Sequence, residues 1–305
     1  MTKTESNIIL FSITLCWASS YIFIKNLPPE LSAFAYLTMT AGLASIILLI
    51  VFFKRLRDFN SKILLRSAAM AAILCVNLIF EKMGIAAIPA STASFIASLN
   101  IVIVPLLLLF FRKRPSRNNL LGILIILSGL ALSSGVKPGQ PLEAGMLYML
   151  SACFLMAVYI ICTDRFTKDH DPLLLGVGQM FFTAILSFIL WSLQEPKTFL
   201  LVNYSNTLLA NIFMLAFFSK AYAYIMLMYS QKYASPLSVT VIASTEPIVT
   251  MVLAVLIPGT FGVNESFTII KLAGAVLIAA GAVCAGTDFL NKKEEKPLAG
   301  NSASL

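Results

Sequence analysis

The chain has 305 residues, of which 59% are hydrophobic and only 12% are charged, and its formal net charge is +8. Because about a quarter of the residues in a soluble domain are charged, this composition excludes a protein whose surface mainly faces water. The basic residues are scattered over short connections, whereas a nucleic-acid-binding face concentrates them, so we expect no nucleic-acid partner. The composition indicates a protein whose main surroundings are the lipid bilayer.

Ten apolar segments follow one another along the chain. Each is close to the roughly 20 residues that a helix needs to cross a hydrocarbon core of about 30 Å. They are too long for membrane β-strands and show no alternation of apolar and polar residues, which excludes a membrane barrel. We predict an all-α membrane protein with ten transmembrane helices, near residues 7–25, 31–53, 63–81, 90–111, 119–135, 143–162, 172–193, 207–229, 236–257 and 267–287.

The two ends of the chain need separate interpretation. The first apolar segment is longer than the core of a secretory signal peptide and a second one follows closely, so we interpret it as a retained helix. No linker or charged domain interrupts the segments, and we expect one membrane domain over residues 1–290. Residues 291–305 are polar, and we predict that they form a disordered cytoplasmic tail.

The basic residues predict the orientation of the chain. If the N-terminus is cytoplasmic, 16 of the 22 Lys and Arg residues lie on the cytoplasmic side, five lie on the opposite side, and Lys220 lies between. Connections rich in Lys and Arg stay in the cytoplasm. The pattern therefore predicts a multi-pass protein of the cell (inner) membrane with both termini in the cytoplasm.

The sequence gives no indication of a metal or a cofactor. The five cysteines form no CxxC pair, so they indicate neither a disulfide framework nor a zinc site. His170 is the only histidine, and one histidine cannot build a multi-histidine centre. There is no nucleotide-binding motif of the GxxxxGK[ST] type, so direct use of ATP would require another subunit.

The ten segments divide into two similar sets of five, near residues 7–135 and 143–287. The fifth segment of each set carries two glycines seven residues apart, which share one helix face and permit close helix packing: Gly122 with Gly129, and Gly274 with Gly281. The stretch IPASTASFIASLNIVIVP resembles YASPLSVTVIASTEPIVT, and SSYIFIKN resembles AVYIICTD. Because five crossings are an odd number, the second set enters the membrane from the opposite face. Such inverted repeats are typical of secondary transporters.

The chain resembles a known family in the order and spacing of several motifs: CWASSYIFIKN, GIAAIPASTASFIASLNIVIVPLLLLFFRKRPS, LLGILIILSGLAL and ASTEPIV. These motifs, spread over about residues 8–287, resemble the EamA-type branch of the drug/metabolite transporter superfamily. The resemblance implies two inverted five-helix repeats around a central cavity and the movement of small metabolites or drugs, often outward. Four positions depart from the usual family pattern: Ala18, Thr38, Glu81 and Lys220.

Lys220 stands out within the apolar stretch FMLAFFSKAYAYIMLMYS. A charge at the bilayer centre costs about 2.5 kcal/mol or more, so such a residue faces a cavity or a partner. Counted along their helices, Lys220 and Glu246 lie at similar depths, and we predict that they pair. Two interpretations remain open: the pair belongs to a substrate or proton site, or it is a structural ion pair that joins two helices.

Other polar and aromatic residues at depth are candidates for the lining of the same cavity. The predicted substrate-binding residues are Trp17, Ser20, Tyr21, Asn77, Asn100, Tyr159, Gln179, Lys220, Tyr224 and Glu246. Core packing or hydrogen bonding between helices would account for the aromatic and amide residues equally well. We expect Glu81 and Lys82 to be wetted, because they lie near the outer end of their apolar segment, and we expect kinks at Pro105 and Pro247.

The sequence therefore favours a secondary transporter, an exporter or exchanger of small organic solutes that works by alternating access. Opposite charges in an aromatic, amide-lined cavity would suit an amino-acid-like zwitterion, or a drug-like solute, with proton exchange or plain facilitated exchange as the drive. A channel and a non-transporting scaffold or sensor are the alternatives. The motifs of common hydrolases and metalloproteases, GxSxG and HExxH, do not occur, so we do not expect an enzyme. The oligomeric state is left open.

Overall fold

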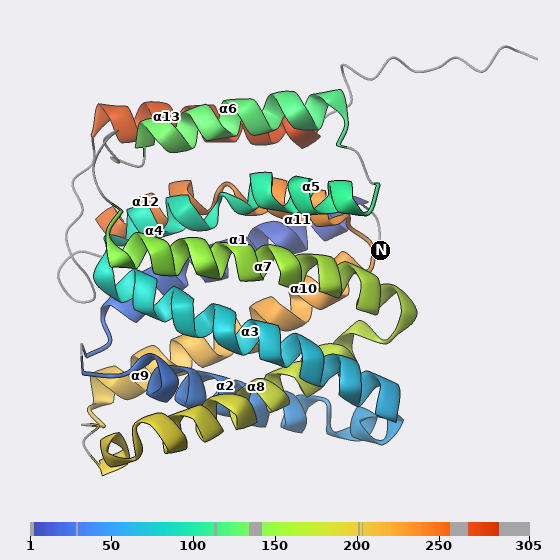
Figure 1. Cartoon of the computed structure of the whole chain (residues 1–305), viewed down its shortest axis with the longest axis vertical. Helices are drawn as coiled ribbons and strands as arrows, with labels where there is room; N and C mark the ends of the chain where they lie inside the picture. Colours follow the sequence, from blue (N-terminus) through green and yellow to red (C-terminus); the bar gives the residue numbers. More distant parts are fainter. Residues whose placement is uncertain are drawn as a thin grey trace, which may run out of the picture.

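The structure is a computed structural model of the whole chain, and it describes residues 3–28, 30–112, 115–133, 142–200, 202, 204–256 and 268–286. These residues are almost entirely helical and include no strand. The helices lie side by side, with the N-terminus, the α2–α3 connection and the α7–α8 connection at one end of the molecule (Figure 1). The predicted tail, residues 291–305, lies outside the described residues.

The helices of the two predicted copies correspond in order. The first copy comprises α1 (Lys3–Lys25), α2 (Ala33–Val51), η1 (Phe53–Asp58), α3 (Ser61–Ala87), α4 (Ala90–Ala97), α5 (Asn100–Phe110) and α6 (Arg117–Ser133). The second comprises α7 (Ala144–Asp169), α8 (Pro172–Gln194), η2 (Pro196–Leu200), α9 (Asn206–Met214), η3 (Leu215–Tyr222), α10 (Ala223–Gln231), α11 (Pro236–Ala243), α12 (Glu246–Leu256) and α13 (Ile269–Gly286).

Short polar side chains fix where several helices begin. Ser32, Asn60 and Asp171 precede α2, α3 and α8, and each accepts a hydrogen bond from a backbone N–H of the first turn. Such caps satisfy donors that have no partner within the helix. The connections can therefore be short, because each helix start is fixed by the residue in front of it.

Eight spans in the described part of the chain are long and apolar enough to cross a membrane. Two of the eight join α4 to α5 and α11 to α12, and a third combines α9, η3 and α10. Two further apolar helices, α6 and α13, are shorter. Large apolar side chains such as Phe110, Leu193 and Ile269 are 82%, 72% and 86% exposed, as expected of a surface that faces lipid.

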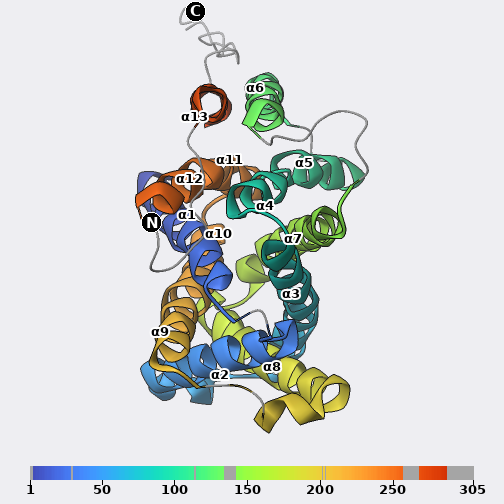
Figure 2. The same cartoon turned by 90° about the vertical axis from the view of Figure 1, so that its left-hand side faces the viewer.

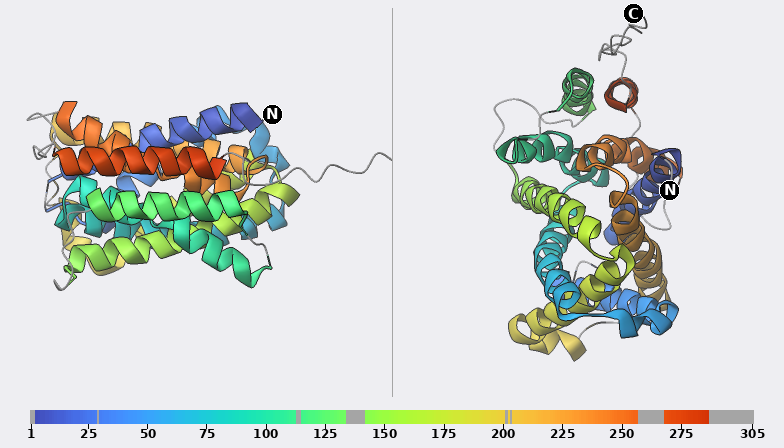
Figure 3. Two further views of the ribbon diagram at one scale, coloured as in Figure 1. Left: turned by 90° about the horizontal axis from the view of Figure 1, so that it is seen from above. Right: turned by 90° about the vertical axis from the view of Figure 1, so that its right-hand side faces the viewer.

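The two copies pack against each other through equivalent helices. The second helix of one copy contacts the second of the other, α2 with α8, and the last contacts the last, α6 with α13. The packing of α3 against α7 has its counterpart in the packing of α1 against η3 and α10. Figures 2 and 3 show α6 and α13 together as one layer beside α4, α5, α11 and α12.

Glycine brings the last helices of the two copies into backbone contact, as predicted. A Cβ atom added at Gly122 would lie 2.6 Å from the Gly281 carbonyl oxygen, and one at Gly129 would lie 2.6 Å from the Gly274 carbonyl oxygen. Any side chain at Gly122 or Gly129 would therefore collide with the backbone of α13. The prediction that these four glycines permit close helix approach is confirmed.

Two ion pairs join the copies at the end that carries the N-terminus. An Nη of Arg55 lies 2.6 Å from an Oδ of Asp171, and an Nη of Arg66 lies 3.2 Å from an Oδ of Asp169. At the same end, the hydroxyls of Ser6 and Ser230 are 2.8 Å apart. These contacts hold that end of the bundle together in this structure.

The α6–α13 contact gives a testable prediction about stability. Gly129→Ala should lower the free energy of unfolding by about 1–3 kcal/mol, because overpacking forces the two backbones apart. Thermal unfolding of the detergent-purified protein measures the effect.

The matched control is Gly42→Ala in α2, where an added Cβ meets no atom within 4 Å. Since alanine forms helix more readily than glycine, this variant should be neutral or slightly more stable. Equal behaviour of the two variants would contradict close backbone contact between α6 and α13.

Candidate functional site

Lys220 lies inside a helix of unusual geometry. The segment from Asn206 to Gln231 changes from α-helix to π-helix over Leu215–Tyr222 and back to α-helix. Single π-turns occur mostly within α-helices and are frequent at functional sites. Lys220 sits within this turn and is 1% exposed, which makes it one of the largest fully buried side chains.

Aromatic rings and a carboxylate surround the Lys220 ammonium. Its Nζ lies 5.6 Å from the ring centroid of Tyr224 and 5.8 Å from that of Tyr36, within the range of cation–π attraction. Glu81 on α3 is its electrostatic partner among the acidic residues. Two tyrosines and one acid, contributed by three different elements, therefore stabilise the buried charge.

The predicted pairing of Lys220 with Glu246 is wrong. In the part of the chain that the structure describes, no carboxylate oxygen lies within 4.0 Å of the Lys220 nitrogen. Glu246 instead interacts with the Tyr21 hydroxyl and, with like charge, with Glu81. The prediction used depth along each helix, and depth does not determine which way a side chain points around the helix axis.

The expectation that Glu81 and Lys82 are wetted at the end of their helix is also wrong for Lys82, whereas Glu81 is partly exposed. The apolar pattern suggested that this helix ends near residue 81, but α3 continues to Ala87. Six further residues correspond to about 9 Å of helix, so both side chains lie inside the bundle. Lys82 is only 5% exposed, and Glu81 lines a cavity at the centre of the bundle.

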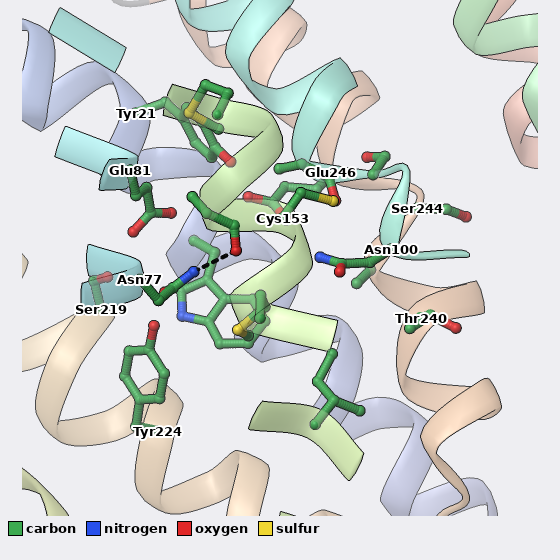
Figure 4. A pocket seen from close by; sticks show the side chains of 18 of the residues that line it. Tyr21, Asn77, Glu81, Asn100, Cys153, Ser219, Tyr224, Thr240, Ser244 and Glu246 are labelled. Carbon is green, nitrogen blue, oxygen red and sulfur yellow. Dashed lines mark hydrogen bonds between the residues drawn. The ribbon is translucent and has the colours of Figure 1, made fainter. Parts of the chain in front are cut away.

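A central cavity of about 50 Å³ lies between the two copies. This volume holds a few water molecules and no larger solute. Figure 4 shows the Tyr21 hydroxyl between Glu81 and Glu246, with Asn77, Tyr224 and Asn100 around the same space. Seven of the ten predicted site residues line this cavity: Trp17, Tyr21, Asn77, Asn100, Lys220, Tyr224 and Glu246.

The other three predicted residues are buried but are not part of the cavity lining. The Tyr159 hydroxyl donates a hydrogen bond of 3.0 Å to Oε1 of Gln179, and the Tyr159 ring contacts that of Tyr224, with the centroids 6.0 Å apart. The Ser20 hydroxyl donates to the Trp17 carbonyl oxygen at 2.7 Å. Through these contacts, the three residues pack behind Tyr224 and Trp17, which do line the cavity.

The cavity also has lining residues that sequence reasoning missed. Glu81 is the most important, because it adds a second carboxylate. Ser98 and Ser244 occupy matching positions in the two copies, two residues before Asn100 and Glu246. Aligning the two copies could have identified both serines. In each copy an alanine and a serine are followed by one further residue and then by the polar residue that lines the cavity. Cys153 also lines the cavity, and its thiol donates to the Ala97 carbonyl oxygen at 3.3 Å.

Both copies interrupt the same helix next to the cavity. The backbone tightens into i→i+3 hydrogen bonds at Leu99 in the first copy and at Thr245 in the second. A new helix then begins at Asn100 and at Glu246, so that the first residue of each lines the cavity. The two prolines at which we expected kinks lie beyond these breaks: Pro105 is in the interior of α5, and Pro247 is the second residue of α12.

The lining has polar groups available for a solute. Nε1 of Trp17 and Oδ1 of Asn100 are buried and have no hydrogen-bond partner among the residues that the structure describes. Buried polar groups normally have one, so these two atoms need a partner inside the cavity. Asn77 is already engaged, because its amide donates to the Ala152 carbonyl oxygen at 2.7 Å.

The charges of the lining do not balance. Its ionisable groups include two carboxylates, of Glu81 and Glu246, and one ammonium, of Lys220. If all three are ionised, one negative charge has no basic partner within the lining. A proton or a cationic group of a solute would neutralise that charge, and the ammonium of Lys220 could hold an anionic group.

Comparisons with known proteins agree with this architecture. The model of the EamA-like transporter family matches residues 5–135 and 143–287, which are the two predicted copies. A solved chain described only as "Crystal structure of protein" has the same fold, with a TM-score of 0.72 over 93% of this chain and 97% of that chain at 18% identity. No curated protein matches the chain in sequence. Because the family model matches nearly the whole length in two repeats, the chain belongs to the EamA-like transporter family.

Proposed function

We propose that the protein is a secondary carrier that moves small organic solutes across the cell membrane by alternating access to the central cavity. The observation that carries the proposal is the convergence of Lys220, Glu81 and Glu246, from both copies, on one cavity. Burying these charges costs stability, and apolar residues could pack there at lower cost. A role in binding accounts for their presence.

The solute class follows from the charges of the lining. The Lys220 ammonium would bind a carboxylate, and Glu246 together with Glu81 would bind an ammonium. The rings of Trp17 and Tyr224, whose centroids are 5.6 Å apart, would cover an apolar side chain. We therefore assign an amino-acid-like zwitterion as the solute class, with drug-like cations as the second class. The ten predicted residues, with Glu81 added, form the binding site and its support.

The small volume of the cavity favours a carrier over a channel. A cavity of about 50 Å³ must widen before it admits an amino acid, so at least one conformational step accompanies each transfer. A channel needs a continuous path lined by like groups. A carrier predicts saturable counterflow of solute, whereas a channel predicts conduction that does not saturate.

The topology belongs to the same proposal. The chain crosses the membrane ten times in two inverted five-helix repeats, with α6 and α13 as the fifth and tenth crossings. Both termini lie in the cytoplasm, because 16 of the 22 basic residues then lie on the cytoplasmic side. The protein is an exporter or exchanger of the inner membrane, and proton exchange at the two carboxylates drives it.

Substitution of the three charged groups tests the site. Lys220→Met, Glu81→Gln and Glu246→Gln should each reduce amino-acid counterflow in proteoliposomes at least tenfold, because each removes a buried charged contact worth about 2–5 kcal/mol. The assay uses a panel of the twenty amino acids, and thermal unfolding checks that each variant is folded.

Lys82→Met is the matched control, because Lys82 is a buried lysine next to Glu81 in the sequence but does not line the cavity. Its counterflow should equal that of the unmodified protein. Unchanged counterflow in all three cavity variants would remove these groups from the mechanism.

Proton coupling gives a second prediction. Because solute leaves in exchange for protons, outward solute movement should acidify the lumen of proteoliposomes in proportion to flux, and Glu246→Gln should abolish this proton movement because its side chain cannot ionise. A dye inside the vesicles reports the pH. Solute-driven proton movement that persists in both Glu246→Gln and Glu81→Gln would contradict coupling through these carboxylates.

A further inference from the structure

Tyr21 lies between the two acids of the central cavity. It is near the C-terminal end of α1, and α1 packs against both α3 and α12, the helices that carry Glu81 and Glu246. The tyrosine is only 2% exposed, and its hydroxyl lies between the two carboxyl groups (Figure 4). Glu246 interacts with this hydroxyl through a hydrogen bond, and Glu81 interacts with it electrostatically. A single phenol group therefore joins an acid of the first copy to an acid of the second.

The hydrogen-bonding capacity of a phenol group limits how these two acids can be charged. A tyrosine hydroxyl has one proton to donate, and its oxygen can accept. If Glu81 and Glu246 were both ionised, the hydroxyl could donate to only one of them, and the other would face the negative side of its oxygen. If one acid is protonated, that acid donates to the hydroxyl oxygen while the hydroxyl donates to the remaining carboxylate. The position of Tyr21 therefore suits one protonated acid and one carboxylate.

The charges of the lining lead to the same number. Among the described residues of the lining, Lys220 is the only base, and it faces two acids. A charge without a counter-charge inside an apolar bundle is costly, and such a group becomes neutral instead. One proton makes this lining neutral. Because the Lys220 ammonium interacts with Glu81, the acid that lacks a base is Glu246.

The other ionisable groups near Tyr21 do not change this count. Cys153 on α7 and Tyr224 on α10 also line the cavity, but a thiol and a phenol are ordinarily uncharged at neutral pH. The Cys153 thiol donates to the Ala97 carbonyl oxygen. Of the other helices that pack against α1, three carry no ionisable side chain: α4, α9 and α11. The protonation of the two acids is therefore decided by the acids themselves and by Lys220.

We propose that Glu246, Tyr21 and Glu81 form a site for one proton inside the cavity, and that Tyr21 is its positioning residue. The protonated carboxyl group of Glu246 donates a hydrogen bond to the Tyr21 oxygen. The Tyr21 hydroxyl donates in turn to Glu81, which Lys220 keeps ionised.

Release of the proton involves one bond. The O–H bond of Glu246 breaks, its electron pair stays on the carboxylate, and the proton passes to water in the cavity. The Tyr21 hydroxyl then turns to donate to Glu246. The part that this proton plays in transport rests on the proposed carrier function, whereas the existence of the site does not.

Infrared spectroscopy of the purified full-length protein tests the site without any solute. A protonated carboxyl group has a C=O stretch that is separate from the bands of a carboxylate and is sensitive to hydrogen bonding. The reference is the double variant Glu81→Gln/Glu246→Gln, so that the bands of all other carboxyl groups cancel in the difference spectrum. At neutral pH, the unmodified protein should show the band of one protonated carboxyl group.

Three single variants test the count of charges. Glu246→Gln and Glu81→Gln should each remove the band, because Lys220 balances the one carboxylate that is left. Lys220→Met should double its area, because two acids then have no base. A band that persists in full in either Gln variant would mean that one acid holds a proton by itself. That result would overturn the shared site, as would an unchanged band in Lys220→Met.

A fourth variant tests the role of the phenol group. Tyr21→Phe should keep the area of the band and move it to a higher frequency, because the carboxyl group loses the oxygen to which it donates. Tyr222→Phe is the matched control: its hydroxyl also contacts α1, at 2.8 Å from that of Ser12, but Tyr222 does not line the cavity. This control should leave the band unchanged. An unmoved band in Tyr21→Phe, or an equal shift in both variants, would overturn the role of Tyr21.

Thermal unfolding checks that each variant is folded. Should a Gln variant fail to fold, the unmodified and Tyr21→Phe proteins still decide the question, because the proposal requires a band at neutral pH that moves when the phenol group is removed. Absence of that band would overturn the site.

The spectra do not depend on flux, so the two proposals can fail separately. The expected bands without any solute-driven proton movement would contradict the proposed function while the proton site stands. Active amino-acid counterflow without the bands would overturn the proton site and leave the carrier function in place.

Discussion

The structure depends on how a single ammonium group is accommodated inside an apolar bundle. Lys220 is buried within a π-helical turn, between the rings of Tyr36 and Tyr224 and near the carboxylate of Glu81. A charge in such a place is tolerated only where rings, acids or water replace its hydration. The central cavity supplies the Tyr224 ring and the Glu81 carboxylate, and the helices that carry these groups come from both copies. The charge therefore links the packing of the two repeats to the chemistry of the space between them.

The duplication of the fold explains why the cavity is neither symmetric nor neutral. Both copies interrupt the equivalent helix and begin a new one at the cavity, but one copy places Asn100 there and the other places Glu246. Close contact of α6 with α13 at glycine joins the last helices of the copies, and the cavity lies between other pairs of helices. The repeat thus provides equivalent helices on the two sides of the cavity. Differences at single positions, such as an amide opposite a carboxylate, give the cavity its charge.

Much of the fold and part of the site could be predicted from the sequence, because membrane spans and glycine contacts between helices follow from the order and spacing of residues along the chain. Every predicted span corresponds to one helix or to two or three joined helical segments, and seven of the ten predicted site residues line the cavity. Two of the errors share one cause. Depth along a helix can be counted from the sequence, but the direction of a side chain around the axis depends on packing. For this reason Glu246 was paired with Lys220 in place of Glu81, and Tyr159 and Gln179 were assigned to a lining that they only support. Glu81 itself was missed because polar residues end the apolar pattern before α3 ends.

The central claim is that Lys220 and the two carboxylates bind the two charged ends of one solute, and a binding cycle tests it most directly. Equilibrium binding of amino acids and of their methyl esters is measured with the unmodified protein and with Lys220→Met. If the ammonium contacts the solute carboxylate, esterification should weaken binding to the unmodified protein at least tenfold and should have little further effect on the Lys220→Met protein, because both changes remove the same contact. Independent, additive losses, or equal binding of acids and esters to the unmodified protein, would contradict the account.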